Sequence, residues 1–159
     1  MLKIGQKAPS FSLPNQLNEM VTQKSLLGQW HVIYFYPKDD TPGCTKEACM
    51  IAEVYKDFKK LGVTVLGVSK DSPKSHLKFA DKYHLPFTLL SDKDGVMLEK
   101  YKALKEKSMF GKTYLGINRI TYIVNPEGKI AHAYEKVDPA SHALEIIKDL
   151  KALKKQATA

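Results

Sequence analysis

The chain has 159 residues, of which 43% are hydrophobic and 26% charged, a composition typical of one globular domain with a sizeable core. No apolar run approaches the ~20 residues of a membrane span, and residues 1–7 lack the apolar segment of a signal peptide, so we expect a cytoplasmic protein without membrane contact. The net charge is +8, but the basic residues near the C-terminus have no interleaved aromatic residues, so they predict a solvated helix face and no nucleic-acid binding.

Cysteine and histidine usage excludes two further classes of protein. Two cysteines, Cys44 and Cys49, are too few for a small scaffold held together by disulfides. The five histidines are scattered and no CxxC occurs, whereas zinc sites usually show paired short spacings. We therefore expect neither a metal site nor a cofactor.

The first sixty residues predict a β-rich start followed by a strand and a helix. Residues 11–13 and 20–22 flank a turn-like stretch and predict a hairpin, which forms an N-terminal β extension. The continuous apolar run at 32–36 is typical of a strand buried on both faces. From Thr45 to Lys60 apolar residues recur at spacings of three and four, which predicts a helix.

The rest of the chain alternates strands and helices. We expect strands at 63–68, 87–90, 119–124 and 129–134, helices at 73–83 and 96–101, and a final helix that Asp138-Pro139 caps. The apolar stripe predicted for that final helix is Ala143, Leu144, Ile147, Leu150 and Leu153. The segment 102–116 has no clear period and predicts a long loop, a feature that is often functional.

This order predicts a single α/β domain over residues 1–159. Alternating strands and helices indicate a central mixed, mostly parallel sheet with helices on both faces, and the closing hairpin adds antiparallel pairing. Together with the N-terminal β extension, this is the element order of a thioredoxin-like fold.

The stretch from Thr41 to Cys49 follows the buried strand and holds both cysteines. With Thr41 as N-cap and Pro42 at the first helical position, Cys44 lies in the first turn, where unpaired N–H groups and the helix dipole favour an anion. The thiolate is the nucleophilic form of cysteine, so we interpret Cys44 as a nucleophile and Cys49 as its partner. A thiolate that dominates at neutral pH needs ~2.7 kcal/mol of stabilisation, and a helix end gives ~0.3–1 kcal/mol, so a nearby cation is expected as well.

Helix geometry limits how the two thiols can interact. Five positions on a helix correspond to a rotation of roughly 140° and a rise of ~7.5 Å, whereas a disulfide needs Cα atoms within ~7 Å and converging Cβ vectors. Either the thiols never pair, or the first turns unwind when they do. Two structural cysteines buried in a core helix are the alternative interpretation.

The same stretch resembles a known family. Pro37, Thr41 and Cys44 fit the peroxiredoxin pattern Pro-x-x-x-Thr/Ser-x-x-Cys, and a second cysteine five residues later is similar to the bacterioferritin-comigratory-protein or Q-type branch. The resemblance runs from about residue 4 to residue 150. It includes the start, residues 4–11, and the segment 116–124, in which an arginine, Arg119, opens a strand. The sequence departs from the branch at Ile120 and Tyr122, where serine and phenylalanine are more usual.

The resemblance implies a thiol-specific peroxidase that reduces hydrogen peroxide and organic hydroperoxides to water and alcohols. The Cys44 thiolate would attack the O–O bond and become a sulfenic acid, Cys49 would then form an intramolecular disulfide with it, and thioredoxin or a similar dithiol would reduce that disulfide. The branch also implies a monomer. The implied site roles are a peroxide hydrogen bond from Thr41, shielding of the thiolate by Pro37, the cation from Arg119, and orientation of Arg119 by Glu47.

Two other classes of function remain as alternatives. A thioredoxin-like thiol-disulfide oxidoreductase acting on proteins would normally carry a CxxC motif, which is absent here. A non-enzymatic binding module would keep the fold and use its basic surface. Consumption of peroxide in the presence of thioredoxin and its reductase distinguishes all three.

Overall fold

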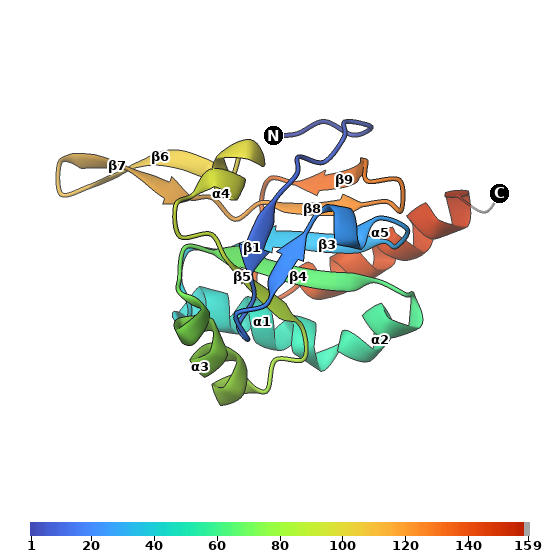
Figure 1. Cartoon of the computed structure of the whole chain (residues 1–159), viewed down its shortest axis with the longest axis horizontal. Coiled ribbons are helices and arrows are strands. Elements are labelled where there is room, and N and C mark those ends of the chain that lie inside the picture. Colours follow the sequence, from blue (N-terminus) through green and yellow to red (C-terminus); the bar gives the residue numbers. More distant parts are fainter. Residues whose placement is uncertain (158–159) are drawn as a thin grey trace.

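The centre of the molecule is a five-stranded sheet with the strand order β5-β4-β3-β8-β9 (Figure 1). The computed structural model describes residues 1–157, so the last two residues of the predicted 1–159 domain lie outside it. β3 pairs in parallel with β4 and antiparallel with β8, and β4 pairs in parallel with β5. The strands are β3 (His31–Phe35), β4 (Thr64–Ser69), β5 (Thr88–Ser91), β8 (Thr121–Val124) and β9 (Ile130–Tyr134).

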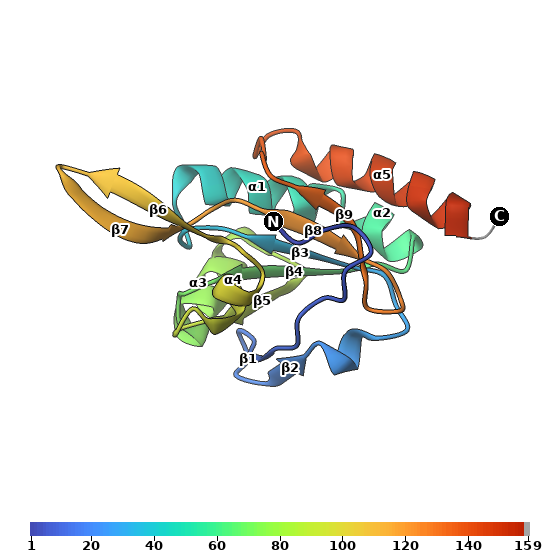
Figure 2. The same ribbon diagram turned by 90° about the horizontal axis from the view of Figure 1, so that it is seen from above.

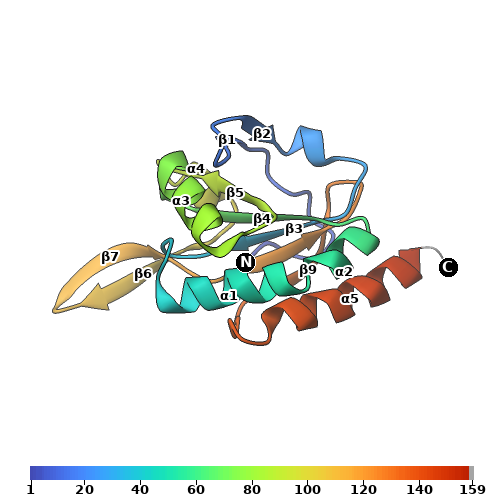
Figure 3. The same cartoon turned by 90° about the horizontal axis from the view of Figure 1, so that it is seen from below.

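Layers cover both faces of this sheet (Figure 2). On one face lie α1 (Pro42–Glu53), α2 (Tyr55–Lys60) and α5 (His142–Ala157), and α1 runs beside α5 (Figure 3). On the other face lie β1 (Ser12–Pro14), β2 (Met20–Thr22), the 3-10 turn η1 (Lys24–Leu26) and α4 (Val96–Lys100), while α3 (Pro73–Tyr83) flanks β5. Two apolar clusters, one on each side of the sheet, form the core.

The residues of β3 explain why this strand is central. All five of its side chains are buried, and the four that follow His31 alternate between the two apolar clusters, with Val32 and Tyr34 in one and Ile33 and Phe35 in the other. A strand with apolar residues on both faces is stable only between two covering layers. The predicted α/β class, with a mixed sheet, helices on both faces and an N-terminal hairpin, is confirmed. No helix within residues 1–157 is long and apolar enough to span a membrane.

The predicted long loop at 102–116 is wrong, because this segment is a hairpin of β6 (Leu104–Met109) and β7 (Lys112–Ile117) that projects from the body of the molecule (Figure 1). Its two turn residues, Phe110 and Gly111, both have positive φ angles, as a two-residue hairpin turn requires. Within 104–117 only Ile117 is buried. The sequence therefore lacks the alternation of apolar and polar residues by which a half-buried strand is predicted.

Two helix predictions are also corrected. The helix predicted over 45–60 breaks at Val54, whose φ and ψ of −107° and 18° end α1 before α2 begins. The final helix begins at His142, because Asp138-Pro139 instead opens a preceding turn in which the Asp138 carbonyl accepts from the N–H of Ser141 and His142. The predicted stripe also misplaces Leu144, which is 56% exposed, whereas Ile146 is buried in its place.

Candidate active site

The start of α1 has the geometry that its sequence predicts. Thr41 is the N-cap in an extended conformation, Pro42 is the first helical residue, and Cys44 lies in the first turn with 2% of its surface exposed. The Thr41 side chain does not cap the helix. Its Oγ1 donates a hydrogen bond to the Lys38 carbonyl at 2.8 Å, which places this hydroxyl in the loop before the helix.

The guanidinium of Arg119 joins this helix from the segment between β7 and β8. Arg119 Nη2 donates to the sulfur of Cys44 at 3.1 Å, and Nη1 donates to Oε1 of Glu47 at 3.1 Å. A cation was expected here because a helix end alone stabilises a thiolate too little. Arg119 is that cation, and it contacts the Cys44 sulfur directly. The structure brings together Cys44, Glu47 and Arg119, three of the six predicted site residues, through direct contacts.

Gly43 makes room for this contact and was not among the predicted site residues. A Cβ atom at this position would lie 2.8 Å from Arg119 Nη2, closer than such contacts allow. Any side chain here would therefore displace the guanidinium from Cys44. The signal in the sequence was a glycine inside the first turn, where it lowers helix stability relative to alanine by up to about 1 kcal/mol.

Glu47 is a carboxyl group in an unfavourable environment. Only 1% of its side chain is exposed, and burial raises its pKa to about 7 although Arg119 acts in the opposite direction. Its second oxygen, Oε2, is buried without a hydrogen-bond partner among residues 1–157. The site thus holds a carboxyl group that ionises near neutral pH next to a thiol and a cation.

This environment predicts a pH-dependent cost in stability. The folded pKa lies above the unfolded value of 4.5, so Glu47 destabilises the fold progressively as pH rises from that value through about 7. The difference corresponds to about 3 kcal/mol. Glu47→Gln should lose less stability than the wild type between about pH 5 and about pH 8, as measured by urea unfolding.

A matched control for this prediction lies at the other end of the same helix. Glu53 is exposed, so Glu53→Gln should keep the pH dependence of the wild type. If Glu47→Gln and the wild type lose the same free energy of unfolding between the two pH values, Glu47 does not titrate as described.

Cys49 lies further along α1 and is half-buried, and both cysteines are free thiols. Burial raises the pKa of Cys49, with a smaller opposing effect from Lys46. Because α1 is continuous from residue 42 to residue 53, the two thiols lie on an intact helix that holds them apart, as the spacing predicts.

Pro37 and Arg119 share a shallow hollow of about 380 Å³. Pro37 is exposed, and the hollow offers apolar surface from Ile117 and Val137 together with charged groups. The β6–β7 hairpin contributes Lys107, whose Nζ donates to the Ile117 carbonyl at 2.7 Å. The segment expected to be functional therefore does reach the site, although as a hairpin.

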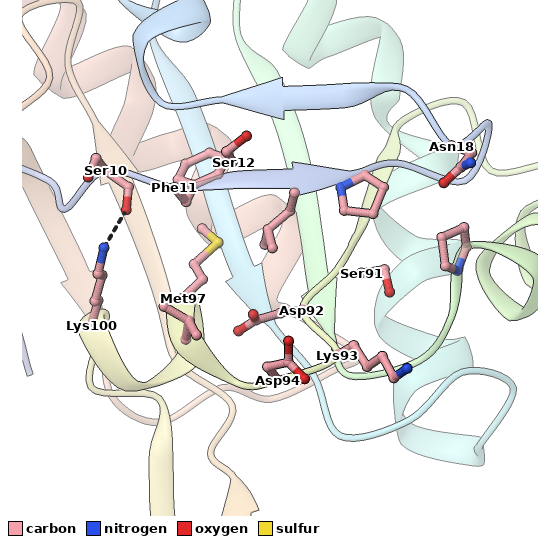
Figure 4. A pocket seen from close by; sticks show the side chains of 14 residues that line it. Ser10, Phe11, Ser12, Asn18, Ser91, Asp92, Lys93, Asp94, Met97 and Lys100 are labelled. Carbon is pink, nitrogen blue, oxygen red and sulfur yellow. Dashed lines mark hydrogen bonds between the residues drawn. The ribbon is translucent and has the colours of Figure 1, made fainter.

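A second hollow, of about 510 Å³, lies between β1, α4 and the residues that follow β5 (Figure 4). Phe11 and Ser12 line it from one side, and Asp92 and Met97 line it from the other. None of the six predicted site residues borders it, so it forms no part of the thiol site.

Comparison with known proteins agrees with a thiol peroxidase site on this fold. The model of the AhpC/TSA family matches residues 4–133, which is most of the chain, and the chain therefore belongs to this family of peroxiredoxins. A putative peroxiredoxin Bcp from Coxiella burnetii is 49% identical over 146 residues, which cover 92% of this chain and 97% of that protein. Peroxiredoxin Bcp from Escherichia coli K12 is 45% identical over 141 residues, which cover 89% of this chain and 90% of that protein.

Solved structures indicate to which branch of the peroxiredoxins the chain belongs. The bacterioferritin comigratory protein of Xanthomonas campestris, studied for alkyl peroxide reduction in trapped intermediate and ligand complexes, superposes with a TM-score of 0.89 at 39% identity. The match covers 94% of this chain and 98% of that one. Within its family the chain is thus a peroxiredoxin of the Bcp branch, also called peroxiredoxin Q, which confirms the resemblance read from Pro37, Thr41, Cys44 and Cys49.

Proposed function

We propose that this peroxiredoxin reduces hydrogen peroxide and organic hydroperoxides with Cys44 as the nucleophile. The observation that carries the proposal is the 3.1 Å contact from Arg119 to the Cys44 sulfur at the start of α1. The thiolate attacks one peroxide oxygen, the S–O bond forms as the O–O bond breaks, and the leaving oxygen takes up a proton to give water or an alcohol. Cys44 is left as a sulfenic acid.

The neighbouring residues take supporting roles in this step. The guanidinium of Arg119 stabilises the thiolate and the negative charge that develops on the leaving oxygen. Glu47 holds one end of that guanidinium through a charge-assisted hydrogen bond, which fixes the other end on the sulfur. The Thr41 hydroxyl turns from the Lys38 carbonyl to the bound peroxide, and Pro37 limits the access of water.

The apolar part of the hollow beside Arg119 favours organic hydroperoxides as well as hydrogen peroxide. Pro37, Ile117 and Val137 offer surface for an alkyl group, and the Xanthomonas campestris relative is described as reducing alkyl peroxides. A stopped-flow comparison of hydrogen peroxide with a bulky organic hydroperoxide measures this preference.

We further propose that Cys49 attacks the Cys44 sulfenic acid, which releases water and leaves an intramolecular disulfide. The first turns of α1 must unwind for this step, since an intact helix keeps the two thiols too far apart. Thioredoxin or a similar dithiol then reduces the disulfide, in the cytoplasm, where thiols are kept reduced. We propose that the protein works as a monomer, which light scattering in each redox state tests.

The decisive test is peroxide consumption in the presence of thioredoxin and thioredoxin reductase. The peroxidase consumes peroxide at a rate that depends on the reductant, whereas a thioredoxin-like oxidoreductase reduces insulin disulfides and a binding module does neither. A protein that reduces insulin but consumes no peroxide would overturn the proposal.

Removing Cys49 should stop the cycle after its first step. One equivalent of peroxide should convert Cys49→Ser to a stable sulfenic acid, seen by mass spectrometry as a gain of ~16 Da, whereas the wild type should lose two hydrogens as its disulfide forms. The same stable sulfenic acid in both proteins contradicts the pairing of Cys44 with Cys49.

A further inference from the structure

The loop between β3 and α1 is held in place by a carboxylate that lies inside the protein. Asp39 is 8% exposed, although its neighbours Lys38 and Asp40 are both exposed. Its Oδ1 accepts from the Tyr36 hydroxyl at 2.6 Å, and its Oδ2 accepts from the Ser75 hydroxyl at 2.8 Å. A charge buried in this way is stable only when it is paired and fully hydrogen-bonded.

His76 on α3 is the ring that binds this carboxylate. Its Nδ1 lies 2.7 Å from Asp39 Oδ2, its Nε2 lies 2.9 Å from the carbonyl oxygen of Leu90 in β5, and its side chain is completely buried. The Leu90 carbonyl can only accept, so Nε2 donates to it, and the 2.7 Å contact between Nδ1 and Asp39 Oδ2 is a second hydrogen bond that joins the two side chains. The other ionisable groups facing it are Tyr36, whose hydroxyl is 3.3 Å from Nδ1, and Asp71.

The side chain of Asp71 binds the backbone of the same loop. Its Oδ2 accepts from the N–H of Asp39 at 2.8 Å and from the Ser69 hydroxyl at 2.8 Å. The next loop residue, Asp40, pairs with Lys82 and Tyr83 at the end of α3, but this contact is exposed and contributes little. The Asp39–His76 pair is therefore the main link between the loop and α3.

This loop carries two of the residues proposed to surround the peroxide. Pro37 lies two residues before Asp39 and Thr41 lies two residues after it. Cys44, Glu47 and Arg119 stand on other elements, and their mutual contacts do not include the Asp39–His76 pair. The pair can thus affect the peroxide-facing side of the site without touching the thiolate and its cation.

We propose that His76 is a positioning residue for peroxide reduction: it binds Asp39 through Nδ1, and this pair fixes the loop that places Pro37 and Thr41 beside Cys44. The proposal rests on the proposed function, in which Thr41 and Pro37 contact or shield the peroxide. A misplacement of about 1 Å in such groups can lower a rate by about 100-fold.

The first test compares His76→Gln with the wild type by stopped flow. Glutamine keeps a donor but lacks the ring that joins Asp39 to the Leu90 carbonyl, so the second-order rate constant for oxidation of Cys44 by hydrogen peroxide should fall by about 10- to 100-fold. The fraction of thiolate as a function of pH, followed by its ultraviolet absorbance, should not change, since Arg119 and Glu47 keep their contacts. A general loss of folding would change both measurements together.

A matched control exists at the end of the same helix. His84 is exposed and has a positive φ angle of 52°, which asparagine tolerates, so His84→Asn should keep the rate of the wild type. If His76→Gln does not fold, Ser75→Ala is the variant that tests the proposal. It removes only the 2.8 Å hydrogen bond to the same Asp39 oxygen, and it should lower the rate several-fold.

Two results overturn the inference. One is that folded His76→Gln oxidises as fast as His84→Asn. If His76→Gln does not fold, the same comparison is made between Ser75→Ala and His84→Asn. The other is a shift of the thiolate titration by the same variant, which would mean that His76 acts on Cys44 itself. A wild type that consumes no peroxide would instead refute the proposed function, so the two failures are distinguishable.

Discussion

Replacing Cys44 by serine should reduce peroxide consumption to the uncatalysed background. The serine hydroxyl is almost entirely un-ionised at neutral pH, so Arg119 and the start of α1 have no anion to stabilise, and no nucleophile remains to attack the O–O bond. The measurement is peroxide consumption with thioredoxin and its reductase in excess. Mass spectrometry of the same sample should show no added oxygen at residue 44.

The control for this experiment is the other thiol. Cys49→Ser should still remove one equivalent of peroxide in the first turnover, because Cys44 and its contacts are intact. Full activity of Cys44→Ser, or loss of the first turnover in Cys49→Ser alone, would mean that Cys49 is the nucleophile. Cys49 is half-buried, and burial raises its pKa more than Lys46 lowers it, so its thiolate is disfavoured and that outcome is not expected.

Replacing Arg119 by methionine should lower the rate of Cys44 oxidation by about 10²–10³-fold, the usual cost of removing one donor from a charge-stabilising site. Methionine keeps much of the volume but removes the cation. The loss should appear across the pH range, because the charge that develops on the leaving oxygen is no longer stabilised at any pH. Stopped-flow rates measured across the pH range test this effect.

Arg119→Lys separates charge from geometry in the same experiment. Lysine restores a positive charge but cannot hold the sulfur and Glu47 through two nitrogens of one planar group, so we expect partial recovery only. Because both variants weaken or remove the contact between residue 119 and the buried Glu47, the folded fraction must be measured alongside the rates. A pH–rate profile in Arg119→Met that matches the wild type would exclude the arginine from the chemistry.

The parts of the fold that sequence predicts well are those whose burial produces a clear pattern. β3 is apolar on both faces and α3 begins with a serine cap and a proline, so both elements are visible in the sequence. The β6–β7 hairpin is not, since its stability comes from backbone pairing and a turn with positive φ angles, and its side chains are mostly exposed. The break at Val54 has no glycine or proline to mark it.

The residues of the site also fall into those that local sequence patterns predict and those that they do not. Thr41 and Cys44 follow from local helix rules, and the cysteine spacing limits how the thiols can meet. Arg119 is 75 residues from Cys44 and was connected to it only through the family resemblance. Asp39 and His76 are 37 residues apart, and no local rule indicates that a loop aspartate and a helix histidine meet inside the protein. Contacts of this kind depend on how the elements pack.

Gly43 has a consequence for any attempt to stabilise this protein. Replacing a helical glycine by alanine is among the standard ways to strengthen a fold, with gains of up to about 1 kcal/mol. At this position the added methyl group would lie 2.8 Å from Arg119 Nη2, and it would also stabilise the turn that opens in the proposed reaction of Cys49 with Cys44. If the proposed cycle holds, alanine at position 43 would therefore make the helix more stable and the enzyme slower, so thermal stability and turnover would oppose each other at a single backbone position.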